Sequence, residues 1–124
     1  MKTPLKVFYM EDDCQLAELL DIRLKSLGFS VCGHADNAGA AVDCIRDTNP
    51  DVALLDIELH GQNEGIAVGD YLLHCTDIPF IYMTGHDEPT ILEQARRTVP
   101  DGFLLKPFDD RQLRGAVEMA MRRD

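Results

Sequence analysis

The sequence is short of positive charge and has no long hydrophobic run, and both shortages exclude classes of function. It holds 12 Lys and Arg residues against 22 Asp and Glu residues, which gives a formal net charge of −10. Direct nucleic-acid binding needs a basic face, because phosphate contacts supply much of that affinity. A membrane helix needs roughly 20 apolar residues in a row, and residues 1–10 lack the apolar core of a signal peptide. We therefore expect a cytoplasmic protein that contacts neither nucleic acid nor membrane directly.

Cysteine is also sparse, and its spacing excludes the common zinc and dithiol motifs. The four cysteines never occur as a CxxC pair, which such motifs require. We expect buried free thiols in a reducing compartment. The four residues are Cys14, Cys32, Cys44 and Cys75.

The chain lacks linkers, low-complexity segments and internal repeats, so its 124 residues are expected to form one domain over residues 1–124. Asp124 lies only three residues beyond the last predicted helix, so no output domain is expected.

Short apolar runs alternate with amphipathic stretches along the whole sequence. The runs predict strands at Lys6–Met10, Ser30–His34, Val52–Leu55, Phe80–Met83 and Gly102–Leu105. The amphipathic stretches predict helices at Asp13–Leu27, Asn37–Thr48, Ile66–His74, Pro89–Val99 and Asp109–Met121. Five strands in alternation with five helices predict an α/β sandwich, with a parallel sheet and helices on both faces.

Polar residues follow four of the predicted strands at the point where each strand ends. They are Glu11 and Asp12 after the first, Asp56 after the third, Thr84 after the fourth and Lys106 after the fifth. The carboxyl ends of parallel strands share one edge, where ligands of open α/β sheets bind. If the first and third strands are neighbours, three carboxylates meet there, and such a cluster needs a cation such as Mg²⁺. Taken singly, each acid is better explained as a helix N-cap or a solvated charge, but this explanation weakens because Thr84 and Lys106 fall at the same edge.

Four segments at these strand ends resemble one family. They are VFYMEDD at residues 7–13, DVALLDIEL at 51–59, PFIYMTG at 79–85 and GFLLKPF at 102–108. In this order they make the chain similar, over essentially its whole length, to the receiver domain of bacterial two-component response regulators of the chemotaxis-regulator type. The resemblance implies a flavodoxin-like (βα)5 sandwich with strand order 2-1-3-4-5.

The resemblance also implies a phosphoryl-transfer site. Asp56 would accept a phosphoryl group from phosphohistidine on a sensor histidine kinase or a histidine phosphotransfer protein. Mg²⁺ would be held by Glu11, Asp12, Asp56 and the backbone carbonyl of Glu58, with Glu11 acting either directly or through water. A carboxylate is a competent nucleophile for this transfer, which depends mainly on positioning and charge neutralisation.

Three further roles follow from the same resemblance. Lys106 would pair with a phosphoryl oxygen, and the Lys106-Pro107 bond corresponds to a position that is usually cis. Thr84 would hydrogen-bond the phosphoryl group, and Phe103 would be the aromatic switch that follows it. A downstream protein partner would then bind the face formed by the fourth helix, the fifth strand and the fifth helix. The chain departs from the common pattern in having Leu59-His60-Gly61 where many members have a proline, and Phe103 in place of a frequent tyrosine.

Two other functions stay open at this point. A Mg²⁺-dependent aspartyl phosphohydrolase would share the D-x-D spacing of Asp56 and Glu58 only faintly, and the chain has little room for a substrate-covering cap. A phosphorylation-independent pseudo-receiver is disfavoured by the complete set of acids with Thr84 and Lys106. We therefore expect no turnover enzyme but a phosphoacceptor that assists its own phosphorylation and dephosphorylation. It would be either a stand-alone protein or the receiver of a hybrid kinase.

Overall fold

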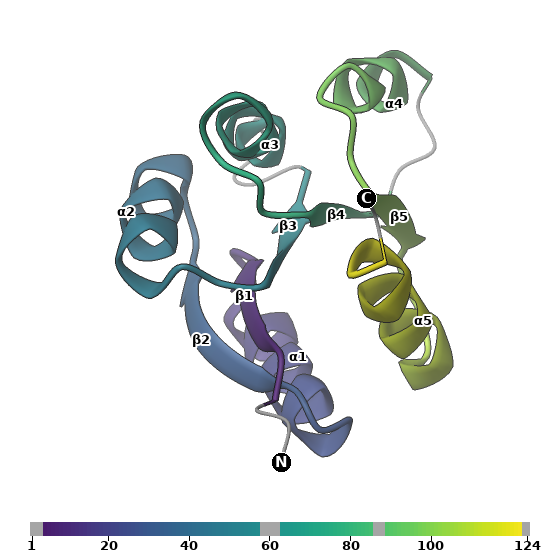
Figure 1. Ribbon diagram of the computed structural model, residues 1–124. Helices are drawn as coiled ribbons and strands as arrows, with labels where there is room; N and C mark the ends of the chain where they lie inside the picture. Colours follow the sequence, from purple (N-terminus) through teal and green to yellow (C-terminus); the bar gives the residue numbers. More distant parts are fainter. Residues whose placement is uncertain (1–3, 58–62, 86–88, 123–124) are drawn as a thin grey trace.

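The computed structural model describes residues 4–57, 63–85 and 89–122, and it forms a five-stranded parallel sheet between two layers of helices (Figure 1). The strands are β1 Lys6–Met10, β2 Ser30–Ala35, β3 Val52–Asp56, β4 Phe80–Thr84 and β5 Gly102–Leu105. The helices are α1 Cys14–Ser26, α2 Ala38–Thr48, α3 Glu64–Cys75, α4 Pro89–Arg96 and α5 Asp110–Ala120. The strand order is β2-β1-β3-β4-β5, which confirms the flavodoxin-like fold.

The central strands owe their place to continuous apolar sequence. Every residue of β3 and β4 is buried, as are the last four of β1, whereas β2 and β5 at the edges are partly exposed. A strand with both faces covered by helices must be apolar at every position rather than at alternate ones. Strands β3 and β4 end in the polar residues Asp56 and Thr84, which are buried like the residues before them. These two buried polar residues mark the carboxyl edge of the sheet.

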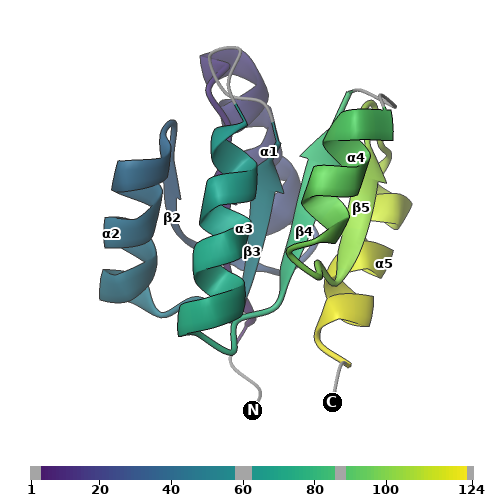
Figure 2. The ribbon, with the colours of Figure 1, turned by 90° about the horizontal axis from the view of Figure 1, so that it is seen from above.

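Two hydrophobic clusters hold the helices on the sheet. Helices α1 and α5 cover one face with Leu20, Leu24, Leu113 and Val117. Helices α2, α3 and α4 cover the other face (Figures 1 and 2). The core on that face holds the rings of Phe8, Phe80 and Tyr82 among aliphatic side chains. Figure 2 shows the strand arrows running in one direction, so all carboxyl ends face the same edge.

The helix boundaries follow from local capping. The side chains of Asp13, Asn37 and Asp109 accept hydrogen bonds from the first turns of α1, α2 and α5, so each predicted helix begins at its N-cap residue. At the other end of α1, Gly28 has a φ of +94° and its N–H donates to Lys25 O, while Phe29 N–H donates to Leu24 O. This is the Schellman arrangement, in which glycine takes the left-handed conformation at no steric cost, and it ends helix α1.

Three expectations are corrected. Helix α4 ends at Arg96 rather than Val99, because Val99 has a φ of +54°, in the left-handed region outside helical geometry. Helix α3 begins at Glu64 rather than Ile66, because Gly65 lets the helix start against the backbone of β3, a tertiary contact that periodicity does not reveal. The cysteines are not buried: Cys14 and Cys75 are exposed, and Cys32 and Cys44 are half-buried, although all four are free thiols. Cys14 is the first residue of α1, beyond the apolar stripe, so its proximity to apolar sequence was misleading.

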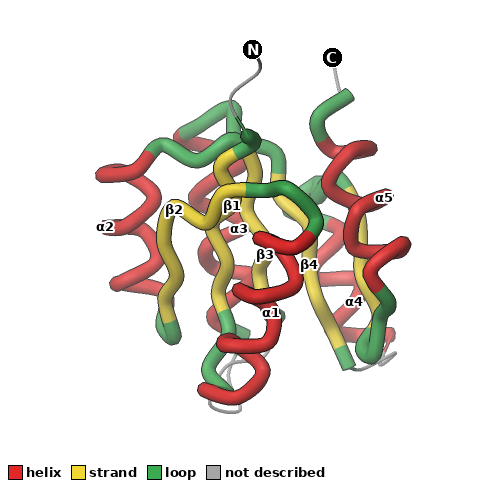
Figure 3. Tube along the Cα trace, turned by 90° about the horizontal axis from the view of Figure 1, so that it is seen from below, coloured by secondary structure: helices red, strands yellow, loops and turns green. Residues whose placement is uncertain are grey.

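Within the part of the chain that the structure describes, no helix is long and apolar enough to cross a membrane. The tube view in Figure 3 shows short helices of similar length around the sheet.

An acidic candidate site at the carboxyl edge of the sheet

Three carboxylates meet where β1 and β3 end side by side. Met10 is paired with Leu55 in the parallel ladder, so the residues that follow them, Glu11 and Asp56, lie next to each other. Ligand oxygens of Glu11, Asp12 and Asp56 all lie within 4.8 Å of one another. Glu11 and Asp56 are only 7% and 6% exposed, and this burial separates the cluster from an ordinary solvated group of acids.

The ammonium group of Lys106 joins two of these acids. Its Nζ donates hydrogen bonds of 2.7 Å to Asp56 Oδ2 and 2.9 Å to Glu11 Oε1. Lys106 reaches this position because its own N–H donates to Thr84 O at 2.7 Å, which ties the end of β5 to the end of β4. The Lys106-Pro107 peptide bond is cis, as expected.

The environment shifts the pKa of both partners. Burial raises the pKa of Asp56 from 3.8 to about 6, with help from the negative charge of Glu11 and against the opposing effect of Lys106. Burial by itself would lower the pKa of Lys106, but its hydrogen bonds to Asp56 and Glu11 outweigh that effect and raise it. Lys106 is therefore a permanent cation at neutral pH, whereas Asp56 carries a destabilised negative charge that a further cation would stabilise.

Thr84 and Phe103 lie on the two strands beyond Asp56. Met83 is paired with Asp56, and Thr84 is the next residue and 4% exposed. Phe103 is paired with Tyr82, its ring lies 5.8 Å from the Tyr82 ring, and it is 39% exposed. The ring of Phe103 is thus not part of the core, and it lies on the strand beside the one that carries Thr84.

One expected ligand cannot be located, and one supporting residue was missed. Glu58, whose carbonyl was expected to bind Mg²⁺, lies outside the described residues. Gly65 was not predicted to matter, yet its N–H donates to Ile57 O at 3.1 Å. A Cβ atom at Gly65 would collide with the carbonyl oxygen of Asp56 and lie 2.9 Å from Ile57 Cα. Its place at a helix start, just after an acidic strand end, was the available signal.

An apolar cavity of about 310 Å³ opens beside the acids, between α1 and the segment after β5. Its walls include Leu16, Leu19, Pro107 and Phe108, and it reaches Glu11 and Lys106. Leu16 and Leu19 are 46% and 50% exposed.

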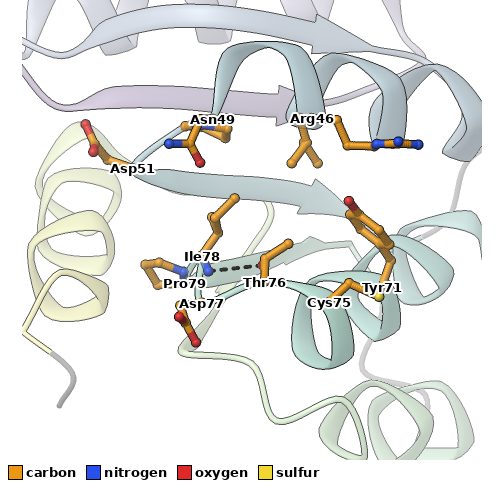
Figure 4. Close-up of a pocket in the computed structure, with 11 residues that line it drawn as sticks. Arg46, Asn49, Asp51, Tyr71, Cys75, Thr76, Asp77, Ile78 and Pro79 are labelled. Carbon is orange, nitrogen blue, oxygen red and sulfur yellow. Dashed lines mark hydrogen bonds between the residues drawn. The ribbon is translucent and has the colours of Figure 1, made fainter.

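A larger hollow, about 500 Å³, lies at the opposite edge, where the loops before β3 and β4 meet (Figure 4). Figure 4 shows Asn49 and Arg46 facing it from the end of α2, and Tyr71 and Cys75 from α3. The hydrogen bond from Ile78 N–H to Thr76 Oγ1, 3.1 Å long, lies in its wall. This hollow is remote from Asp56 and is at the edge where open α/β sheets do not usually bind ligands.

Comparison with known proteins agrees with this geometry. Residues 7–118 match the model of the response regulator receiver domain. The chain is 29% identical over 119 residues to the DNA-binding response regulator MtrA of Mycobacterium tuberculosis, covering 96% of this chain and 51% of that protein. MtrA of Mycobacterium leprae matches equally well, with 52% covered. The chain thus spans about half the length of these relatives.

Solved structures give the same result. The signal receiver domain of a modulated diguanylate cyclase from Desulfovibrio desulfuricans G20 has a TM-score of 0.89 and 35% identity, with 96% of this chain and 94% of that chain covered. The N-terminal domain of a response regulator/sensory box/GGDEF protein from Carboxydothermus hydrogenoformans has a TM-score of 0.83 and 29% identity, with 94% of each chain covered. Because the family model matches residues 7–118 of 124, this chain belongs to the response regulator receiver family of two-component signalling.

Proposed function

We propose that the protein accepts a phosphoryl group on Asp56 from phosphohistidine and changes conformation to control a partner or to relay the phosphate. The observation that carries the proposal is the placement of one buried carboxylate between two other acids and an ammonium group, with Lys106 Nζ 2.7 Å from Asp56 Oδ2. This constellation offers a nucleophile and the charge neutralisation that phosphoryl transfer requires.

The donor set fits Mg²⁺. Three carboxylate ligands within 4.8 Å of one another are all oxygen donors, which hard divalent cations prefer. Glu11, Asp12 and Asp56 would hold the ion, and the carbonyl of Glu58 stays a proposed fourth ligand. When bound, Mg²⁺ would offset negative charge on the transferring oxygens.

The chain's own residues would carry the remaining steps. A carboxylate oxygen of Asp56 attacks the phosphorus, a P–O bond forms, the P–N bond to the histidine breaks, and the electron pair returns to the imidazole. The Lys106 ammonium, already within hydrogen-bond distance of Asp56, pairs with a phosphoryl oxygen. The Thr84 hydroxyl, at the end of the neighbouring strand, hydrogen-bonds another.

The response would travel from Thr84 toward Phe103. Phosphorylation replaces the single negative charge of the Asp56 carboxylate by about −1.5 to −2, and a movement of Thr84 toward the phosphoryl group vacates space near β5. Phe103 is the bulky neighbour on that strand, and because it lacks a hydroxyl group its position depends on packing against Tyr82. A packing element with two states, biased by a local charge, is the minimum that a switch needs.

The partners follow from exposure and charge. A sensor histidine kinase or histidine phosphotransfer protein would supply the phosphoryl group. A downstream protein would bind the face formed by α4, β5 and α5, where Phe103 and Leu105 are exposed, with Val99 between α4 and β5. We propose no direct contact of this chain with nucleic acid or membrane and a cytoplasmic location. That proposal applies to this chain alone, because its DNA-binding relatives are about twice as long.

The test is phosphoryl uptake followed by intact-mass spectrometry. With Mg²⁺ and acetyl phosphate the wild-type chain should gain one phosphoryl group, and Asp56→Asn should gain none. Asp70→Asn, at a carboxylate that is 65% exposed on α3, is the matched control and should behave as wild type. Equal labelling of Asp56→Asn and wild type would disprove the assignment.

A separate outcome distinguishes the rival activity. An aspartyl phosphohydrolase would release many phosphates per chain from a phosphate ester, whereas a receiver takes one phosphoryl group from an activated donor. Steady release from an ester that is abolished by Asp56→Asn would favour the hydrolase.

A further inference from the structure

The segment that carries Lys106 is tied to the sheet at its first residue, where Lys106 N–H donates to Thr84 O at 2.7 Å, and is less constrained beyond that residue. Lys106 is the first residue after β5, and Pro107, which follows it, has no N–H to donate. Pro107 is exposed, and the apolar cavity of about 310 Å³ lies between this segment and α1. Packing therefore leaves room for the segment to shift, and other contacts must fix its position.

Arg23 on α1 supplies three such contacts across the edge of the cavity. Its Nη2 donates a 2.8 Å hydrogen bond to the carbonyl oxygen of Phe108, and its guanidinium carbon lies 4.9 Å from the centre of the Phe108 ring. Its Nε donates to Asp110 Oδ1 at 2.7 Å. One planar group makes all three contacts, so it constrains the orientation of the segment as well as its distance from α1.

The contacts to Phe108 matter more than the ion pair. The Asp110 carboxylate is 57% exposed, so its attraction to Arg23 is screened by water. The guanidinium itself is mostly covered, because the Arg23 side chain is 21% exposed. A covered, charge-assisted hydrogen bond to a backbone carbonyl and a cation–π contact are stronger restraints.

Phe108 is two residues from Lys106, so its carbonyl anchors the far end of a short segment whose near end is held by the bond from Lys106 N–H to Thr84 O. Lys106 Nζ must satisfy Asp56 and Glu11 together, at 2.7 and 2.9 Å. Hydrogen bonds weaken over a few tenths of an ångström, and a misplacement of about 1 Å in a reacting group reduces rates up to a hundredfold.

We infer that Arg23 is a positioning residue for phosphoryl transfer: it holds the segment after β5 against α1, across the cavity, and so places the Lys106 ammonium on Asp56. The inference rests on the proposed function for its consequence in transfer, but the placement of Lys106 is independent of any donor. It gives a residue of α1, 85 residues from Phe108 in sequence, a role in the site.

The experiment is a double-mutant cycle with Arg23→Gln and Lys106→Ala, in which the rate of phosphoryl uptake from acetyl phosphate with Mg²⁺ is measured. Arg23→Gln alone should slow uptake by about 5- to 10-fold. In the Lys106→Ala background it should have little further effect, because its action passes through the lysine. Arg114→Gln is the matched control, since Arg114 Nη2 also joins α5 to α1, through a 3.2 Å bond to Leu27 O away from the site. It should change the rate less than about 2-fold.

A second readout needs no phosphodonor. In the metal-free protein, the NMR signal of the Lys106 ammonium should shift and its protons should exchange faster in Arg23→Gln, and neither should change in Arg114→Gln. Effects of Arg23→Gln and Lys106→Ala that multiply, or an unchanged Lys106 signal, would overturn the inference. Absence of uptake by the wild type with an altered Lys106 signal in Arg23→Gln would instead refute the proposed function and leave the positioning role supported.

Discussion

Opposing effects act on the pKa of the Asp56 carboxyl group, and burial outweighs the attraction of Lys106. Burial and the neighbouring Glu11 favour its protonated form, and Lys106 favours the carboxylate, with a pKa of about 6 as the result. A nucleophile must be ionised to attack, so the proposed acceptor would be competent at neutral pH, but its charge is costly to the fold. This cost can be measured.

Asp56→Asn should stabilise the metal-free protein at neutral pH. Between pH of about 4 and 6 the folded wild type binds the Asp56 proton more tightly than the unfolded chain, so its stability falls as the pH rises through this window. Asparagine does not titrate. The free energy of unfolding at neutral pH should therefore be about 1–3 kcal/mol higher in Asp56→Asn, with the difference disappearing near pH 4.

Urea denaturation at a series of pH values checks this expectation. Asp70→Asn, at an exposed carboxylate, should follow the wild-type pH profile. If Asp56→Asn keeps the wild-type pH dependence in this window, the raised pKa of Asp56 is wrong.

Asp12 and Glu11 should contribute unequally to metal binding. Asp12→Ala should weaken Mg²⁺ binding by about tenfold or more, because a carboxylate oxygen that would contact the ion is lost. Glu11→Ala should weaken it less if Glu11 acts through water, although it also frees Lys106 from one partner. Calorimetric titration suits a chain that has no tryptophan. An affinity unchanged by Asp12→Ala would place the ion elsewhere.

Residue types at strand ends were predictable from sequence, but the contacts among them were only partly so. Glu11, Asp12, Asp56 and Lys106 were placed at one edge because strand ends in a parallel sheet coincide. The simultaneous bonding of Lys106 to Glu11 and Asp56 spans 95 and 50 residues. No periodicity encodes the reach of a lysine side chain, so that geometry required the structure.

At the scale of secondary structure, helix α3 depends on close approach to the sheet. Gly65 lies against the backbone of Asp56 and Ile57, and a side chain there would collide with the Asp56 carbonyl. Gly65→Ala should therefore lower the free energy of unfolding by about 2 kcal/mol or more and weaken Mg²⁺ binding, because the end of β3 must move.

Gly39→Ala is the matched control for this prediction. Gly39 lies in the first turn of α2, and an added Cβ atom there meets only Asn37 Oδ1, at 3.6 Å. Alanine is the better helix former, so the change should be neutral or stabilising by up to about 1 kcal/mol. Thermal unfolding of both variants is the measurement, and a Gly65→Ala protein as stable as Gly39→Ala would show that the contact is not tight.

Helix starts and buried strands were predicted well where particular residues mark the ends of these elements. The predicted helices that begin at Asp13, Asn37 and Asp109 start correctly, because these residues are the N-caps of α1, α2 and α5. The fully buried strands were correct to within one residue, because continuous apolar sequence between polar ends is hard to misplace. The start of α3 was missed because it depends on packing against β3.

At the scale of the whole molecule, the central question is how a change of charge at Asp56 would alter the exposed face formed by α4, β5 and α5. We expect Thr84→Ala to leave phosphorylation at Asp56 largely intact and to weaken the conformational response in α4 and β5. Lys106→Ala should impair the same response with some loss of acceptor reactivity. The reason is that Thr84 and Lys106 lie at neighbouring strand ends, where they would bind the phosphoryl oxygens.

Amide chemical shifts with and without beryllofluoride, a phosphoryl mimic, measure this response. The wild type should show shifts that extend from residue 84 to residue 108. Gly39→Ala, remote from β4 and β5, should reproduce them. A full wild-type shift pattern in Thr84→Ala would contradict the proposed coupling.

The Lys106 bridge also determines which ion can neutralise the negative charge of the site. Three carboxylates and one ammonium leave the pocket with a formal charge of −2, so a divalent cation brings it to electroneutrality, while a monovalent ion leaves it one charge short. A phosphoryl group on Asp56 upsets that balance. It replaces the single charge of the carboxylate by about −1.5 to −2, and the compensating positive charge must then come from a rearrangement of the protein. The pocket is thus matched in charge to a divalent ion, and a phosphorylated pocket would not be, which would provide a thermodynamic source for the proposed conformational change.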